Sequence, residues 1–235
     1  YDEPMYLYNV GAKAFFVPGE PYETRAQLND VGTEVTIVDN GDGTFLLKDY
    51  VPKFKKVLCT FADGWDSDDE DDLPDGNVWC DNDGHEGRFW TVATTGSDIY
   101  RISIASTVSY AEKWPNTFLG VKLGGADPLL YWNLTADQGD IDWYFVTVAD
   151  KKNHVEAIEI YKLAQTLKAL IDEAKAAGVD VSAQETVYLD ESATTDELNT
   201  AIQAIKDALA ALEEGKVTAD QPVDKTTLIT NPSYD

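Results

Sequence analysis

The sequence predicts a closed all-β architecture of three similar four-stranded units, followed by an antiparallel hairpin of two helices. Three observations lead to this prediction: a change of composition near residue 150, a threefold internal repeat before it, and two apolar stripes of helical period after it. We expect an all-β domain over 4–150, a helical hairpin over 151–216, and a linker that begins a further module over 217–235.

The all-β part is rich in Val, Ile, Tyr, Phe and Trp, in short runs broken by Gly, Asp, Asn and Pro. Each repeat unit offers four short strands, and each first strand starts on an aromatic residue: Tyr6, Phe45 or Tyr100. The turns DNGDGT at 39–44 and TTGSD at 94–98 separate the units, because Asn and Gly tolerate positive φ. Twelve strands in three units favour a closed barrel, which leaves no exposed sheet edge. A generic β-sandwich is the alternative.

The part after residue 150 is rich in Ala, Leu, Lys, Glu and Ile. We expect Gly178 to end a first helix, a capping box of Thr194 and Glu197 to start a second, and Gly215 to end it. The first apolar stripe is Val155, Ile158, Leu163, Leu167, Leu170, Ile171 and Ala174. The second stripe is Leu198, Ile202, Ile205, Leu209 and Leu212. Both stripes are predicted to pack in a core rather than to form a ligand groove.

The charge of the chain limits its partners. With 43 acidic and 18 basic residues, the formal net charge is −25. Such a chain repels phosphate backbones and anionic lipid surfaces, so we expect neither a nucleic acid partner nor membrane insertion. No run of apolar residues is long enough to span a bilayer. Sugars, cations and basic protein surfaces remain possible ligands.

The most acidic stretch, ADGWDSDDEDDLPDGN at 62–77, lies between Cys59 and Cys80. In the repeat it falls between the second and third strands of unit two, where unit one is shorter. We therefore predict an inserted surface loop with the two cysteines on the paired strands at its base. A disulfide between them fits an exported chain and a secreted or cell-surface location, while two buried thiols are the alternative.

Calcium is the metal that the acidic loop suggests, because carboxylates are hard oxygen ligands. The candidates are Asp66, Asp68 and Asp71, but the stretch lacks the glycine and the final glutamate of an EF-hand loop. We expect a solvated loop, keep a calcium site as the minority interpretation, and expect no other cofactor. His85 and His154 are predicted to lie in a solvated turn and on a helix surface.

No motif for a nucleophile, a zinc site or a phosphate-binding loop is present, and 43 acids make any carboxylate pair uninformative. We therefore expect no enzyme. Sugars stack on indole rings, and neighbouring Asp and Asn side chains accept hydrogen bonds from sugar hydroxyls. The ligand-binding candidates, all in or near predicted loops, are Trp65, Asp66, Trp114, Trp132 and Asn133. Trp90 and Trp143 are predicted to lie in the core.

Several motifs carry a family resemblance: YLYNVGAKAFFVPG with TRAQL, NVWCDN with FWTV, and NTFLGVKLGG with LLYWNLT and DWYFVTV. They resemble ricin-B-like β-trefoil domains, in particular those of secreted or surface multidomain proteins of gut Bacteroidetes. The resemblance covers 4–150 and implies a β-trefoil with a recognition role. The Gln-x-Trp of ricin-type lectins is absent, since the fourth strands carry Arg88-Phe89-Trp90 and Ile141-Asp142-Trp143.

The helical part resembles FIVAR-like spacer modules, and LITNPSYD near the end resembles the first strand of a carbohydrate-binding sandwich module. Two functions follow as hypotheses. The first is a non-catalytic recognition module, carbohydrate-binding, with the helices as a spacer. The second is a structural or protein-interaction scaffold without sugar binding. The expected partners are a glycan or a surface protein, and further domains of the parent chain.

Overall fold

The structure, a computed structural model, divides the chain into two compact units, one up to Ile158 and one from Glu159 onward. The described residues are 3–19, 24–49, 56–60, 76–81, 86–124 and 128–219. Within them the chain forms thirteen strands, two short 3-10 helices and three α-helices. These strands all belong to the first compact unit, called the barrel unit below, and the second is called the helical unit. Units one, two and three are the three sequence repeats within the barrel unit.

The strands follow the predicted threefold repeat. Unit one contains β1 (Met5–Asn9), β2 (Ala14–Gly19), β3 (Arg25–Asn29) and β4 (Val35–Asp39). Unit two contains β5 (Phe45–Asp49), β6 (Val57–Cys59), β7 (Trp79–Asp81) and β8 (Trp90–Gly96). Unit three contains β9 (Ile99–Ile104), β10 (Phe118–Lys122), β11 (Tyr131–Leu134) and β13 (Trp143–Thr147), with the two-residue β12 (Gly139–Asp140) as an addition.

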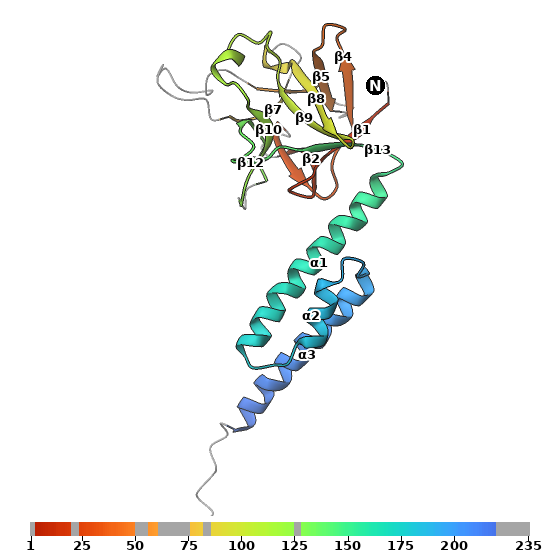
Figure 1. Cartoon of the computed structure of the whole chain (residues 1–235), viewed down its shortest axis with the longest axis vertical. Helices are drawn as coiled ribbons and strands as arrows, with labels where there is room; N and C mark the ends of the chain where they lie inside the picture. The colour runs from red at the N-terminus through yellow and green to blue at the C-terminus, as the bar shows by residue number, and fades with distance from the viewer. Residues whose placement is uncertain are drawn as a thin grey trace, which may run out of the picture. The chain divides into compact units, whose positions relative to one another are not determined.

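The first and fourth strands of the three units close into a barrel (Figure 1). Their order is β13-β9-β8-β5-β4-β1, and β1 pairs back with β13 from Met5↔Thr147 to Asn9↔Trp143. The second and third strands form the hairpins β2–β3, β6–β7 and β10–β11. The arrangement is β-trefoil-like, so the predicted closed barrel of three units is confirmed and the sandwich alternative is wrong.

The three hairpins meet one another through buried backbone and side-chain hydrogen bonds. The Ala26 N–H donates to the Val78 carbonyl, and the Leu130 N–H donates to the Ala26 carbonyl, each at 3.0 Å. The buried Arg25 guanidinium donates to the same Val78 carbonyl at 2.6 Å and to the Leu130 carbonyl at 3.0 Å. One cation of unit one therefore ties units two and three together.

Trp90 and Trp143 lie in the core, as predicted, and neither is exposed at all. Each begins the fourth strand of its unit and donates its indole N–H to a backbone carbonyl of the second strand. Trp90 Nε1 bonds the Leu58 oxygen at 2.7 Å, and Trp143 Nε1 bonds the Leu119 oxygen at 2.9 Å. Because a buried donor is costly without an acceptor, these bonds set the position of both rings.

The predicted disulfide is wrong, although Cys59 and Cys80 do lie on paired strands. The register pairs Cys59 with Trp79 and Leu58 with Cys80. Since neighbouring residues of a strand point to opposite faces of the sheet, the two thiols lie on opposite faces and cannot bond. Both are fully buried, and burial raises the pKa of the Cys59 thiol to about 12.

The first turns of α1 (Lys151–Ala176) belong to the barrel unit rather than to a separate helical domain. Ile158 is 3% exposed and packs with Tyr8 and Phe15. His154 was expected on the surface, but its ring lies 4.7 Å from that of Tyr8, and burial lowers its pKa. Val155 was expected in the apolar stripe, but it is 40% exposed. The stripe is therefore divided between two cores.

The described residues of the helical unit form three helices, so the predicted two-helix hairpin is not confirmed. The remainder of α1 is followed by α2 (Ser182–Leu189) and α3 (Thr195–Ala219). Helix α2 lies in the segment predicted to be a connection, although Asp180 provides a local signal for a helix start there. The Asp180 carboxylate accepts the Ser182 N–H at 3.0 Å. Helix α3 runs through Gly215, because one helical glycine costs only about 1 kcal/mol.

Both predicted helix boundaries near the connection are confirmed. Gly178, at φ +81°, completes a Schellman motif in which the Val179 N–H donates to the Ala174 carbonyl at 2.9 Å. In the capping box, the Thr194 N–H donates to Glu197 Oε2 at 2.8 Å, and the Glu197 N–H donates to Thr194 Oγ1 at 3.3 Å.

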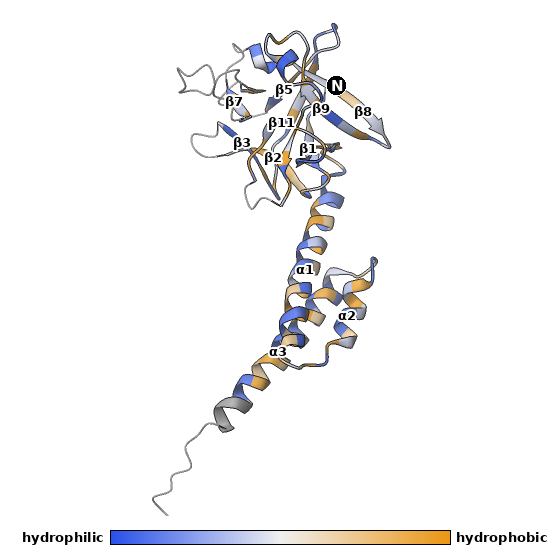
Figure 2. Cartoon of the chain, turned by 60° about the vertical axis from the view of Figure 1, so that its left-hand side comes forward, coloured by the Kyte–Doolittle hydropathy of each residue, from blue (hydrophilic) through white to orange (hydrophobic). Residues whose placement is uncertain are grey.

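The core of the helical unit is built from buried aliphatic side chains. Figure 2 shows apolar and polar residues alternating along all three helices. The buried members are Leu167, Ile171, Ala174, Val181, Ala193, Leu198, Ala201, Ile202 and Ile205. This confirms most of both predicted stripes, while Leu212 is 38% exposed. Within the described part of the chain, no helix has the length and apolar character that crossing a membrane requires.

Candidate functional site

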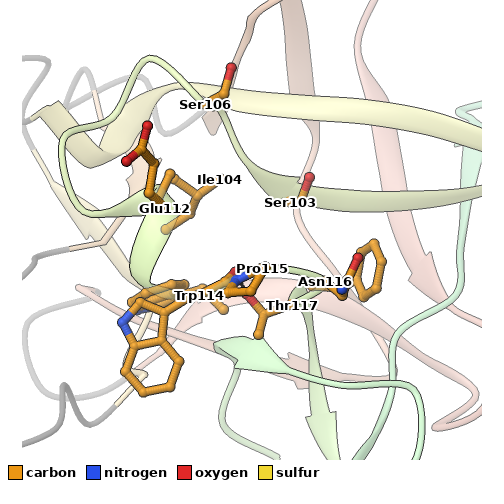
Figure 3. A pocket seen from close by; sticks show the side chains of 11 residues that line it. Ser103, Ile104, Ser106, Glu112, Trp114, Pro115, Asn116 and Thr117 are labelled. Carbon is orange, nitrogen blue, oxygen red and sulfur yellow. Dashed lines mark hydrogen bonds between the residues drawn. The ribbon is translucent and has the colours of Figure 1, made fainter.

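A pocket of about 320 Å³ lies in unit three, between β9 and the segment that leads to β10 (Figure 3). It combines aromatic, hydroxyl and amide groups. The side chains that line it are Ser103, Ile104, Ser106, Ala111, Glu112, Trp114, Pro115, Asn116, Thr117, Phe118 and Trp132. In Figure 3, Ser103 on its strand lies across the hollow from Trp114, Pro115 and Thr117. Its volume is at the lower end of the range for small-ligand pockets.

Short-range hydrogen bonds build the wall that carries Trp114. The chain turns at the 3-10 helix η2 (Ala111–Lys113), and the Trp114 N–H donates to the Ala111 carbonyl at 3.1 Å. The Thr117 hydroxyl then donates to the Trp114 carbonyl at 2.9 Å. Between them Asn116 has φ +60°, a left-handed conformation that Asn tolerates better than most residues. The sequence WPNT thus makes a tight turn that presents Trp114.

Trp114 and Trp132 contact each other but differ in exposure. Their rings meet edge to face, with centroids 5.8 Å apart and an interplanar angle of 78°. Trp132 is 1% exposed and also contacts Tyr110, with ring centroids 5.7 Å apart. Trp114 is half-buried, so part of its indole ring is open to solvent. The core tryptophan therefore supports the accessible one.

The indole N–H of Trp132 is a buried donor that has no hydrogen-bond partner among the described residues. Trp90 and Trp143 are equally buried, yet each donates to a backbone carbonyl. Unpaired buried donors are rare because each costs about 1–3 kcal/mol. Trp132 is also one of the residues that line the pocket.

The charged residues at and beside the pocket differ in whether their charges have partners. Among the described residues that line it, Glu112 is the only charged one, and its side chain is exposed. Arg101 lies beside the pocket, with its guanidinium 5.5 Å from the Phe118 ring centroid, but it bonds Asp142 Oδ1 at 2.8 Å. Glu86 accepts hydrogen bonds from the backbone N–H and the hydroxyl of Ser109, which lies three residues before Glu112 in the chain.

The structure brings together two of the predicted binding residues, Trp114 and Trp132. Asn133 is half-buried on β11, against Gly76, and does not line the pocket. Trp65 and Asp66, with the calcium candidates Asp68 and Asp71, lie outside the described residues. His85 lies outside them as well.

Sequence reasoning missed most of the polar lining. Ser103, Asn116 and Thr117 lie close to Trp114 in space, and Asn116 and Thr117 follow it directly in the sequence. The turn WPNT was a usable signal, since Pro followed by Asn favours a tight turn. Ser103 could not be found in this way, because only the pairing of β9 in the barrel places it opposite Trp114.

A second hollow, between α2 and α3 in the helical unit, lacks these features. Its lining is Ala183, Gln184, Val187, Asp196, Glu197, Thr200, Ala201 and Ala204. None of these described residues is aromatic, and Glu197 is already engaged in the capping box. As for metals, the described residues contain no group of three or more His, Cys, Asp or Glu side chains arranged to hold an ion.

No protein-family model matches the chain, and no curated protein matches it in sequence. Among solved structures it is similar to ThreeFoil, a designed threefold-symmetric protein, at 16% identity and a TM-score of 0.45, over 63% of this chain and 100% of that one. The trefoil-like assignment rests on this chain's own strand pairings. The finer resemblances, to ricin-B-like domains and FIVAR-like modules, stay predictions.

Proposed function

We propose that the barrel unit is a non-catalytic carbohydrate-binding module and that Trp114 stacks on the bound sugar. The observation that carries this proposal is the composition of the pocket in unit three. A half-buried indole ring forms part of one wall, and the hydroxyls of Ser103 and Thr117 and the amide of Asn116 line the same hollow. Sugars need this combination, because their C–H faces stack on aromatic rings while their hydroxyls form hydrogen bonds.

A binding role fits the acids of the pocket better than hydrolysis does. Glycoside hydrolysis ordinarily uses two carboxyl groups on either side of the scissile bond. Glu112 is the only acid among the described residues that line the pocket, and it is exposed. An exposed carboxyl also lacks the enclosed apolar surroundings in which a glycosidase acid lies.

The proposal includes an extracytoplasmic location, at the cell surface or secreted, with the helical unit as a spacer to further modules of a longer protein. Its support is the aromatic and polar lining of the pocket, which suits a sugar, and the net charge of −25, which disfavours nucleic acid partners. The cysteines no longer support it, because Cys59 and Cys80 are not joined by a disulfide.

A glycan array, followed by titration of Trp fluorescence with the sugars that bind, tests this function. We expect millimolar or tighter binding, and a Trp114→Ala variant should bind about tenfold more weakly because it loses the stacking surface. Trp79→Ala is the matched control, since Trp79 is also half-buried but does not line the pocket. No binding to any sugar, or an equal loss in both variants, would contradict the proposal.

A second variant separates ligand contact from loop folding. Asn116→Gly removes the amide but keeps a residue that adopts φ +60° readily, so the loop should retain its shape. We expect this variant to bind sugar several-fold more weakly while its melting temperature stays close to that of the wild type. An unchanged affinity would remove Asn116 from the proposed contacts.

The scaffold function remains the second candidate, and one observation favours it. Trp90, Trp132 and Trp143 all lie in the core. Of the two described tryptophans that line the pocket, Trp114 and Trp132, only Trp114 therefore offers an accessible ring. A protein-interaction scaffold predicts that a partner protein retained from a cell-surface fraction stays bound in the presence of competing sugar. Release by sugar would favour the carbohydrate-binding function instead.

A further inference from the structure

The pocket in unit three also carries information about which sugars it accepts. We propose that it selects neutral sugars over acidic ones, such as uronic acids, and that Glu112 is the residue that discriminates between them. This inference rests on the proposed carbohydrate-binding function and deepens it by naming the ligand class.

Glu112 lies close to Trp114 in the chain. It lies on η2, two residues before Trp114, and it is one of the residues that line the same hollow (Figure 3). No described residue forms a hydrogen bond or ion pair with its carboxylate. The carboxylates of Glu86 and Asp142, by contrast, are held by Ser109 and Arg101. Glu112 therefore adds to the pocket lining a negative charge that no described hydrogen bond or ion pair engages.

The described lining of the pocket offers no cation beside that charge. Among the described residues that line the pocket, none is Lys, Arg or His. Arg101 is the basic residue packed against the pocket residue Phe118, and its Nε bonds Asp142 at 2.8 Å. Sites that recognise carboxylate ligands typically offer Arg or Lys for charge-assisted hydrogen bonds. Besides its aromatic rings, the described lining of this pocket offers hydroxyl, amide and carboxylate groups, which suit a neutral polyhydroxylated ligand.

Repulsion between the Glu112 carboxylate and a carboxylate of the ligand sets the size of the expected selectivity. A ligand carboxylate held about 6 Å from the Glu112 carboxylate would bind about tenfold more weakly at an effective dielectric constant of about 40. The net charge of −25 on the whole chain adds a long-range repulsion of the same sign. Both effects act between exposed charges, so salt should reduce them.

The test compares matched sugar pairs: methyl galactoside with methyl galacturonoside, and methyl glucoside with methyl glucuronoside, together with their oligomers. Affinities are measured by calorimetry for the wild-type chain at about 10 mM and about 1 M salt, where the screening length falls from about 30 Å to about 3 Å. For any pair that binds, we expect the neutral member to bind about tenfold more tightly at low salt and the difference to shrink at high salt.

The variant Glu112→Gln should bring the two members of a pair to within about threefold of each other, chiefly by strengthening binding of the acidic member. Glu156→Gln is the matched control, because Glu156 is an exposed carboxylate on α1 that does not line the pocket. It removes the same charge and should leave the ratio unchanged.

The outcomes separate the two proposals. If an acidic sugar binds the wild-type chain as tightly as its neutral partner, or if Glu112→Gln leaves the ratio unchanged, the charge selection is wrong while sugar binding stands. If no sugar of either form binds, the carbohydrate-binding function fails and this inference fails with it.

Discussion

The barrel unit and the helical unit obtain their structures from contacts of very different range. In the barrel, Met5 pairs with Thr147 across almost the whole unit, and Arg25 bonds carbonyls of the two other repeat units. In the helical unit, the decisive bonds link residues three to five apart, as at Gly178 and Thr194. The comparison teaches that helix ends depend on local chemistry, while the barrel depends on a few buried groups that join distant strands.

The largest expected effect comes from truncating a buried group that joins barrel strands. Trp143→Ala removes a fully buried ring and its hydrogen bond to the Leu119 carbonyl, so the free energy of unfolding should fall by about 4 kcal/mol. Denaturant unfolding, followed by the fluorescence of the other tryptophans, measures this. All six tryptophans lie before residue 150, so the signal reports on the barrel. A loss below about 1 kcal/mol would contradict the importance assigned to this bond.

The second effect is a loss of barrel stability in alkali. Burial raises the pKa of Cys59 to about 12, so the folded chain keeps a proton that the unfolded chain releases above its ordinary pKa near 9. The contribution of this thiol to the free energy of unfolding is therefore fully present below about pH 9. It is lost as the pH rises toward 12, by about 1.4 kcal/mol per pH unit for this one group. Burial raises the pKa of Tyr110 as well, which adds a loss of the same sign above about pH 10.

The measurement for Cys59 is the free energy of unfolding between pH 8 and 11 in the wild type and in Cys59→Ala. The variant should be less stable at pH 8 but should show a shallower decline, because it no longer carries the buried thiol. Cys80→Ala is the comparison at the neighbouring buried thiol. Parallel curves for wild type and Cys59→Ala would show that another group causes the decline. A reducing agent should leave the melting temperature of the wild type unchanged, since no disulfide is present.

In the helical unit, a single local change should have a smaller effect. Gly178 has φ +81°, and a Cβ placed there would meet no atom within 4 Å. The cost of Gly178→Ala is therefore backbone strain alone, about 1 kcal/mol. Thermal unfolding followed by circular dichroism at the helical band measures it. Gly178→Asn should cost less, because Asn tolerates the left-handed region, and equal losses for Ala and Asn would contradict the strain explanation.

The smallest expected effect is at the unpaired indole of the pocket. Trp132→Phe removes an N–H that has no hydrogen-bond partner among the described residues, so only ring volume is lost and the cost should be about 1 kcal/mol or less. Trp143→Phe breaks a bond of 2.9 Å and leaves the Leu119 carbonyl without it, and should cost about 2–3 kcal/mol. Equal losses in the two variants would show that the Trp132 N–H has a partner, such as an ordered water.

Particular residues show how far the sequence alone could go. The repeat with its aromatic starts predicted the three units, and DNGDGT and TTGSD lie at the junctions of β4 with β5 and of β8 with β9. Gly178 and the capping box of Thr194 and Glu197 were predicted correctly, because each acts on residues close in the chain. Helix α2 was missed because its start signal at Asp180 is short and was assigned to a connection.

For the site, the sequence singled out Trp114 and Trp132 but could not show that one is accessible and the other buried. Their exposure depends on the packing of Tyr110 and Trp132 beneath the loop, which is a tertiary contact. The predicted disulfide failed for a similar reason. Spacing alone placed Cys59 and Cys80 on neighbouring strands, but the register directs their side chains to opposite faces of the sheet.

The sequence by itself determined the two textures of the chain, the threefold repeat and the local helix ends, because these depend on residue type and on neighbours within a few positions. Only the tertiary structure decided the closure of β1 onto β13, the opposite faces of the two thiols, and the meeting of Ser103 with Trp114 in one pocket. Each of these depends on strand register and on side-chain packing between distant segments. A one-residue shift of register would reverse them without changing the pattern of residue types.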